Sequence, residues 1–190
     1  MYGNPYGTLP LYGGGPGFTN PVSYQQFQPN PHNMTATDYG QQPFVINIHN
    51  KTKQNTTFRT ALWSGSHLQL TVMCLNVGED IGLEMHPDVD QFLRIEQGQG
   101  FVQMGKNRNE LTFARYAGED SAIIIPAGTW HNLTNTGNIP LKLYSIYAPP
   151  NHPFGTIHLT KADAVAAEYN EGSNYVNFYG QPTDFPSGIR

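Results

Sequence analysis

Charged residues are scarce in this sequence, and those present show no basic excess. Only 13% of its 190 residues are Asp, Glu, Lys or Arg, against about 25% in an ordinary domain. The 10 basic residues are outnumbered by 14 acidic ones, which gives a formal net charge of -4 at pH 7. Because there is also no basic run, binding of nucleic acid through neutralised phosphates is excluded as its function.

Cysteine and long apolar runs are also lacking. Cys74 is the single cysteine, which excludes an internal disulfide and a zinc site built from several cysteines. We expect it to be a small buried strand residue. No apolar stretch approaches the roughly 18 residues of a membrane span, so we expect no membrane association. The first residues show no basic region followed by an apolar one, so we expect no secretory signal and predict a cytoplasmic location.

Glycine and proline are abundant, at 20 and 15 residues, which argues against a helix bundle. Residues 1–40 alone hold six Pro, seven Gly and five Tyr, but only one charged residue, Asp38. A segment of this kind buries too little apolar area to offset its ordering entropy. We predict that residues 1–42 form a flexible Tyr/Gly/Pro-rich arm. It either packs on its own domain or a neighbouring subunit, or serves as an adhesive segment.

From residue 43 onward, short apolar and β-branched runs alternate with turns of Gly, Asn and Asp. These runs predict about ten strands of an all-β sandwich or barrel, over residues 44–48, 58–63, 67–77, 82–86, 91–96, 100–104, 111–115, 121–125, 129–134 and 141–147. Only residues 161–169 have a helical pattern, with Thr160 placed to cap it. We predict a barrel over residues 43–160, then a short helix and an irregular tail over residues 161–190.

Two stretches concentrate residues that can bind a metal ion. In the first, Glu84 and His86 stand two apart, so on a strand they face the same side like two arms of a chelate. Gln91 follows across a turn, and His131 lies on a later strand behind a Pro-x-Gly turn. Four nitrogen and oxygen donors from three strands can meet inside a barrel. Such a set suits zinc or another first-row divalent ion.

The two stretches resemble the two motifs of the cupin superfamily. The spacing of the first motif is kept by Gly78, Glu84, His86, Gln91 and Gly98, and that of the second by Pro126, Gly128, His131 and Asn135. The resemblance covers roughly residues 66–150. It implies a cupin double-stranded β-helix (jelly-roll) barrel with one divalent metal ion at its centre, and often a homodimer.

Two of the expected ligands differ from the residues usual in the motif. Glu84 stands where a histidine is usual, and Gln91 where a glutamate is usual. A glutamine carbonyl is the weaker ligand, but the number of carboxylates stays at one. We interpret the pair as a relocated carboxylate and predict the metal ligands Glu84, His86, Gln91 and His131. The alternative is a metal-free barrel in which Glu84 and Gln91 hydrogen-bond the two histidines.

The donor set of one Glu, one Gln and two His resembles that of the zinc-dependent phosphomannose isomerases. The first functional hypothesis is therefore non-redox, isomerase-like chemistry on a small sugar-like or polyol substrate, with Zn or Mn bound. Glu84 would be both ligand and catalytic base. A sugar phosphate requires a basic side chain in the pocket. Arg59 or Lys142 can supply it, whereas strand alternation turns Arg94 away from the face of Gln91.

Two other functions stay open at this point. One is a small-cupin dioxygenase that uses Fe, Mn, Ni or Cu. The other is non-enzymatic, either a ligand-binding protein or a structural protein of a spore coat or other surface layer, which the composition of the arm favours. Of Tyr144 and Tyr147, one must face the interior. We expect His152, in a loop rich in proline, to be a surface histidine.

Overall fold

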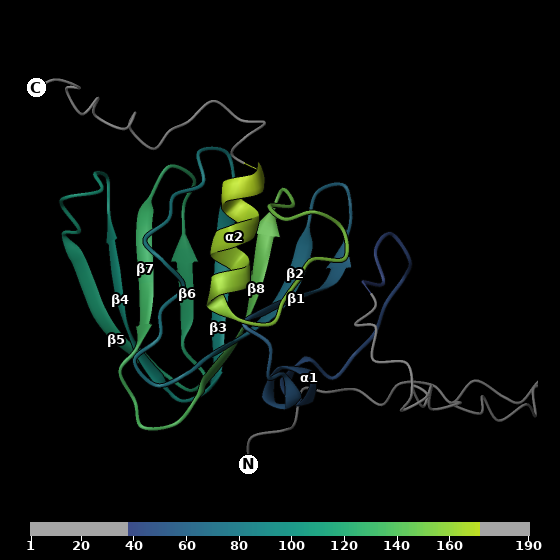
Figure 1. The fold of residues 1–190 in the computed structure, drawn as a ribbon, viewed down its shortest axis with the longest axis horizontal. Coiled ribbons are helices and arrows are strands. Elements are labelled where there is room, and N and C mark those ends of the chain that lie inside the picture. Colours follow the sequence, from purple (N-terminus) through teal and green to yellow (C-terminus); the bar gives the residue numbers. More distant parts are fainter. Residues whose placement is uncertain (1–37, 172–190) are drawn as a thin grey trace, which may run out of the picture. The chain divides into compact units, whose positions relative to one another are not determined.

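The computed structural model describes residues 38–171, so the predicted arm before Asp38 and the tail after Glu171 lie outside the described residues. The described part belongs to one of the two units into which the chain divides, residues 35–190. Its elements (Figure 1) are α1 (Ile48–Gln54), β1 (Arg59–Ser64), β2 (Gln69–Leu75), β3 (Asp90–Gln97), β4 (Gln99–Gly105), β5 (Phe113–Gly118), β6 (Ala122–Ile125), β7 (Trp130–Asn135), β8 (Leu141–Ala148), β9 (Ile157–His158) and α2 (Lys161–Glu171).

The strands form two antiparallel sheets with the core between them. The larger sheet has the order β6-β3-β8-β2-β1-β9 and the smaller one β5-β4-β7 (Figure 1). Leu93 and Leu143 from the larger sheet join Val102 and Leu133 from the smaller one in a single buried apolar cluster. The all-β, jelly-roll fold that the sequence predicted is confirmed.

The inner face of the larger sheet has an apolar and a polar end. Along β8, burial alternates with a period of two, so that Leu141, Leu143, Ser145 and Tyr147 all face inward. Cross-strand partners share a face, and Leu143 pairs with an inward methionine of β2 whereas Ser145 pairs with Thr71. The polar end of this face is where a ligand can be held by hydrogen bonds inside the barrel.

The strand predicted over residues 44–48 is wrong. These residues lead into α1, which the sequence pattern did not reveal, and the side chain of Val45 is 99% exposed. Asn47 caps the helix, because its side-chain oxygen accepts a hydrogen bond from the Asn50 amide at 2.9 Å. This capping, together with lysines in the last turn, overrides the β-propensity of the preceding apolar residues.

The strand predicted over residues 82–86 is reduced to a single bridge. Glu84 and His131 exchange two backbone hydrogen bonds, of 3.1 and 2.9 Å, and the His86 carbonyl accepts a third from Gly128 at 2.8 Å. The extended segment therefore lies along β7 without forming a full strand. This pairing still places Glu84 beside the second motif, as the metal prediction requires.

The C-terminal helix lies where the sequence predicted it. Thr160 and Asp163 form a reciprocal cap: the Thr160 hydroxyl accepts from the Asp163 amide, and the Asp163 carboxylate accepts from the Thr160 amide. Ala164 packs into the buried core, and Lys161 pairs with Asp80. Neither α1 nor α2 has the length and apolar character needed to cross a membrane.

Candidate metal centre

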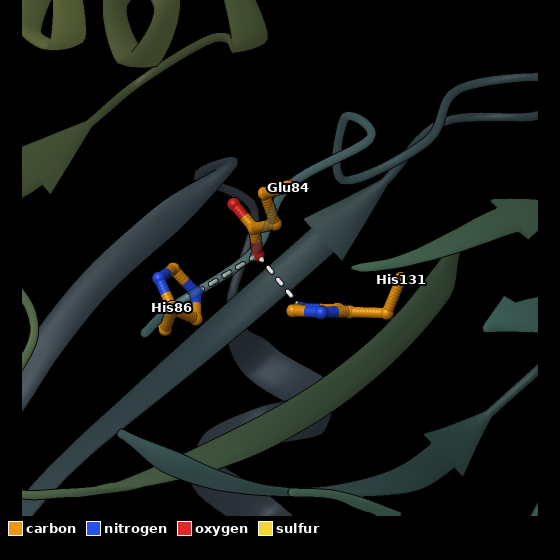
Figure 2. Close-up of side chains that lie close together, drawn as sticks. All are labelled: Glu84, His86 and His131. Atoms are coloured by element: carbon orange, nitrogen blue, oxygen red, sulfur yellow. Dashed lines mark ion pairs between the residues drawn. The ribbon is translucent and has the colours of Figure 1, made fainter. Parts of the chain in front are cut away.

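Three of the four predicted ligands converge on one point inside the barrel. Glu84, His86 and His131 offer ligand atoms that all lie within 4.8 Å of one another. The Glu84 carboxylate is directed between the two imidazole rings (Figure 2). Glu84 and His86 come from the segment beside β7, and His131 from β7 itself. Glu84 and His86 thus face the same side, as their two-residue spacing predicted.

The distances between the Glu84 carboxylate and the two histidines are those expected of ligands around one metal ion, and they are long for hydrogen bonds. Glu84 Oε1 lies 3.5 Å from His86 Nε2 and 3.4 Å from His131 Nε2, beyond the range of a good hydrogen bond. Among residues 38–171, none of these three atoms has a hydrogen-bond partner, although all are buried. Ligand bonds of about 2.0–2.1 Å at tetrahedral angles place neighbouring ligand atoms about 3.4 Å apart.

A backbone contact orients the His131 ring as a ligand requires. Its Nδ1 lies 2.9 Å from the Thr129 carbonyl oxygen. Because a carbonyl can only accept, Nδ1 donates this hydrogen bond, so in the neutral ring the lone pair is on Nε2, which is directed toward Glu84. A backbone contact of this kind fixes both the tautomer and the ring orientation. The imidazole is 1% exposed.

Electrostatics keep Glu84 ionised. Burial by itself raises the pKa of this carboxyl, but contacts with His131 and His86 and the charge of Arg59 outweigh it and hold the pKa well below its usual range. An ionised carboxylate is the form that binds a metal ion. The same low pKa makes Glu84 a weak base.

Gln91 brings its amide to the same end of the barrel from β3. It is 2% exposed and pairs with Tyr147 of β8, whose ring centroid lies 5.9 Å from that of His86. Its Nε2 donates to Ser145 Oγ at 3.1 Å, which leaves Oε1 buried without a hydrogen-bond partner among the described residues. The amide oxygen is the atom that the ligand prediction requires, and it is the one left unpaired.

The structure decides which basic residues face the site. Arg59 lies on the inner face, because its register partner on β2 is the core residue Met73. Lys142 instead donates to the carbonyl of Lys53 in α1, and Arg94 pairs with Asp120 at 2.6 Å. Of these three residues, only Arg59 therefore faces the interior, where it could contact a substrate phosphate. The prediction that Arg94 turns away from the face of Gln91 is confirmed.

Two aromatic residues of the site were left open or misjudged by the sequence analysis. Tyr147 is the inward tyrosine and is fully buried, whereas Tyr144 lies against Phe92 on the other face. The expectation that His152 is a surface histidine is wrong, because its ring packs edge-on against Tyr147 at 5.0 Å and its Nε2 is buried. Gln69 holds this loop by accepting from the His152 amide and donating to its carbonyl. No local pattern signals this long-range contact.

Comparison with known proteins agrees with the fold and the motifs. The profile of a family described as "Cupin domain" matches residues 71–147. The uncharacterized protein YrkC of Bacillus subtilis is 70% identical over 136 residues, 72% of this chain and 73% of that protein. The uncharacterized protein L612 of Acanthamoeba polyphaga mimivirus is 37% identical over 139 residues, 73% of this chain and 85% of that protein.

A solved structure supports the same conclusion. The crystal structure of BH2720 from Bacillus halodurans is 63% identical to this chain, with a TM-score of 0.68. The match covers 68% of this chain and 98% of that one. The motifs, the two-sheet barrel and these relatives agree: the chain belongs to the cupin family, and its barrel holds a Glu/His cluster that can bind a metal ion.

Proposed function

We propose that this cupin binds one divalent metal ion through Glu84, His86, Gln91 and His131. The observation that carries the proposal is that each of these side chains has a buried donor atom without a hydrogen-bond partner among residues 38–171. Unpaired buried polar atoms are costly, and one metal ion offsets that cost for all four. The metal-free alternative is less favoured, because the amide nitrogen of Gln91 bonds Ser145 instead of a histidine.

The donor set favours zinc or manganese and non-redox chemistry. Imidazole suits zinc, and carboxylate and carbonyl oxygens suit manganese. A single carboxylate leaves a bound divalent ion with a net positive charge, and when bound such an ion polarises a substrate carbonyl or hydroxyl oxygen. We infer an isomerase-like reaction on a small sugar-like or polyol substrate, in which a proton is moved on the carbon beside that oxygen.

Glu84 has two roles in this proposal. It is first a ligand, because its low pKa keeps it ionised. It also receives the substrate proton, for which it is a weak base, so the reaction depends on acidification of the substrate by the polarised oxygen. Tyr147 and Ser145 line the same polar end of the barrel, where Ser145 orients the Gln91 amide.

Deuterium exchange tests the reaction directly. The full chain loaded with Zn or Mn is incubated in D2O with aldoses, ketoses and sugar acids, and NMR follows deuterium at the carbon beside the carbonyl. We expect exchange with at least one substrate, loss of it in Glu84→Gln, and no change in the exposed control Glu110→Gln.

Two results would contradict the isomerase proposal. Oxygen consumption that depends on iron or copper at the same ligands would identify a dioxygenase instead. Tight metal binding with neither exchange nor oxygen consumption would favour a non-enzymatic binding or coat protein.

A further inference from the structure

Arg59 is a buried cation that forms no ion pair with a carboxylate among the described residues. It is 1% exposed. Its Nε has no hydrogen-bond partner among the described residues, and its guanidinium lies 5.5 Å from the ring centroid of Phe58. Arginine is almost never fully buried unless it is paired. The Arg59 guanidinium is therefore a candidate partner for an anion.

Two other buried polar atoms are unpaired among the described residues, on side chains that the charge of Arg59 also reaches. The Tyr147 hydroxyl and the His152 Nε2 are buried without hydrogen-bond partners among the described residues, and their rings are in contact at 5.0 Å. The three side chains come from separate segments: β1, β8 and the loop after β8. Tyr147 also contacts His86 at 5.9 Å, so this group of donors is continuous with the metal ligands.

The balance of charge favours an anionic ligand. Burial raises the pKa of Tyr147 and lowers that of His152, and the charge of Arg59 lowers the pKa of both to a lesser extent, as it does that of Glu84, so its field reaches the whole group. Burial and Arg59 hold the pKa of His152 well below its usual range, which keeps the ring neutral at pH 7. Glu84 contributes one negative charge. A divalent ion would bring the site to a net positive charge of one, and Arg59 to two.

We propose that Arg59, Tyr147 and His152 form an oxyanion subsite beside the metal ligands, which receives the carboxylate or phosphate group of the substrate. The planar guanidinium supplies the charge and a forked pair of donors, and the phenol and imidazole supply neutral polar groups that can adapt to either anion. That the bound anion belongs to a substrate rests on the proposed function. Binding of the anion itself requires only the three side chains.

Anion binding to the full chain tests this subsite without an activity assay. Titration calorimetry measures the binding of inorganic phosphate and of malonate to zinc-loaded and to chelator-treated protein. The variants are Arg59→Met, which removes the charge at similar length, and Arg59→Lys, which keeps the charge but loses the fork. Arg115→Met, at an exposed arginine, is the matched control.

We expect at least one of the two anions to bind. Its affinity should fall more than tenfold in Arg59→Met and less in Arg59→Lys, and stay unchanged in Arg115→Met, with equal zinc content throughout. A phosphate preference indicates a phosphorylated substrate, and a malonate preference a carboxylic acid. Anion binding that depends on Arg59 in chelator-treated protein would support the subsite even if the proposed metal site were wrong. Binding that is lost in His86→Ala/His131→Ala but unaffected in both Arg59 variants, or no binding of either anion, would overturn it.

Discussion

The candidate metal centre has a single carboxylate, and it stands at position 84 and not at position 91. The neutral amide of Gln91 occupies the inner face of β3, where it bonds Ser145. If the carboxylate ligand has been relocated from position 91 to position 84, moving it back to position 91 should lower the metal affinity only moderately.

Exchanging the two residues tests this. Glu84→Gln leaves four neutral donors, so metal affinity should fall by more than the roughly 10–100-fold that loss of a supporting hydrogen bond costs. The swap Glu84→Gln/Gln91→Glu restores one carboxylate and should recover much of that loss, as measured by competition with a chelating dye. A swap that binds no better than the single variant would contradict the account.

His152 should make the stability of the protein depend on pH. Burial, and then the charge of Arg59, lower its pKa in the folded state, whereas the unfolded chain titrates near its usual value of about 6.5. Below that pH the unfolded state takes up a proton that the folded state does not. The free energy of unfolding therefore falls as the pH is lowered from about 7 to 5.

His152→Phe keeps an aromatic ring against Tyr147 but cannot titrate, so it should flatten this pH dependence. Burial also lowers the pKa of His158. The part of the pH dependence of stability that comes from His158 should therefore remain in this variant. Urea unfolding with a chelator present measures the effect, and His67→Gln, at an exposed histidine, should keep the wild-type slope. Identical slopes in His152→Phe and the wild type would show that the ring is not held neutral by its surroundings.

At the scale of elements, one buried glutamine joins β2 to the loop that carries His152. Gln69 is fully buried; its amide donates to Ser64 and to the His152 carbonyl, and accepts from the amides of Asn151 and His152. Gln69→Leu leaves these groups unpaired, so it should cost about 1–3 kcal/mol or more in the free energy of unfolding. Gln99→Leu, at an exposed strand position, should stay within about 0.5 kcal/mol. Equal urea midpoints for the two variants would contradict this role.

The alternation of single strands was predictable, but contacts between distant segments were not. β8 and β3 each bury one face, so their period-two pattern is visible in the sequence. That the side chains of Glu84, His86 and His131 lie close together was expected from the motifs, whereas the backbone bridge between Glu84 and His131 was not. The inward direction of Tyr147 depends on strand register, and the burial of His152 depends on Gln69, 83 positions away. The strand predicted over residues 44–48 was wrong because the helix cap at Asn47 outweighed the β-propensity of the apolar residues.

At the scale of the whole molecule, the packed part of the chain begins no later than Asp38, which the sequence assigned to the arm. Its buried carboxylate accepts hydrogen bonds from Gly40, Ser64 and Gly155. If residues 1–37 belong to the predicted flexible arm, their deletion should leave the midpoint of thermal unfolding and the metal content unchanged. Deletion of residues 1–42 should lower the midpoint, because it removes this carboxylate. Calorimetry compares the two, and equal losses of stability would show that the earlier residues contribute to the barrel.

The predicted homodimer is also a property of the whole molecule. Light scattering should give a mass near twice 21.1 kDa, and a monomer would contradict the prediction. The same measurement on the chain without residues 1–37 tests whether the arm contributes to association, as a coat or surface-layer role would require.

The central claim is that Glu84, His86, Gln91 and His131 together hold one metal ion. Elemental analysis of the full chain, purified without an affinity tag, tests it most directly beside His86→Ala/His131→Ala and the exposed control His67→Gln. We predict about one equivalent of zinc or manganese in the wild type and the control, and none in the double variant. No metal in the wild type, even after reconstitution with Zn, Mn, Fe, Ni and Cu, or an equal content in the double variant, would contradict the account.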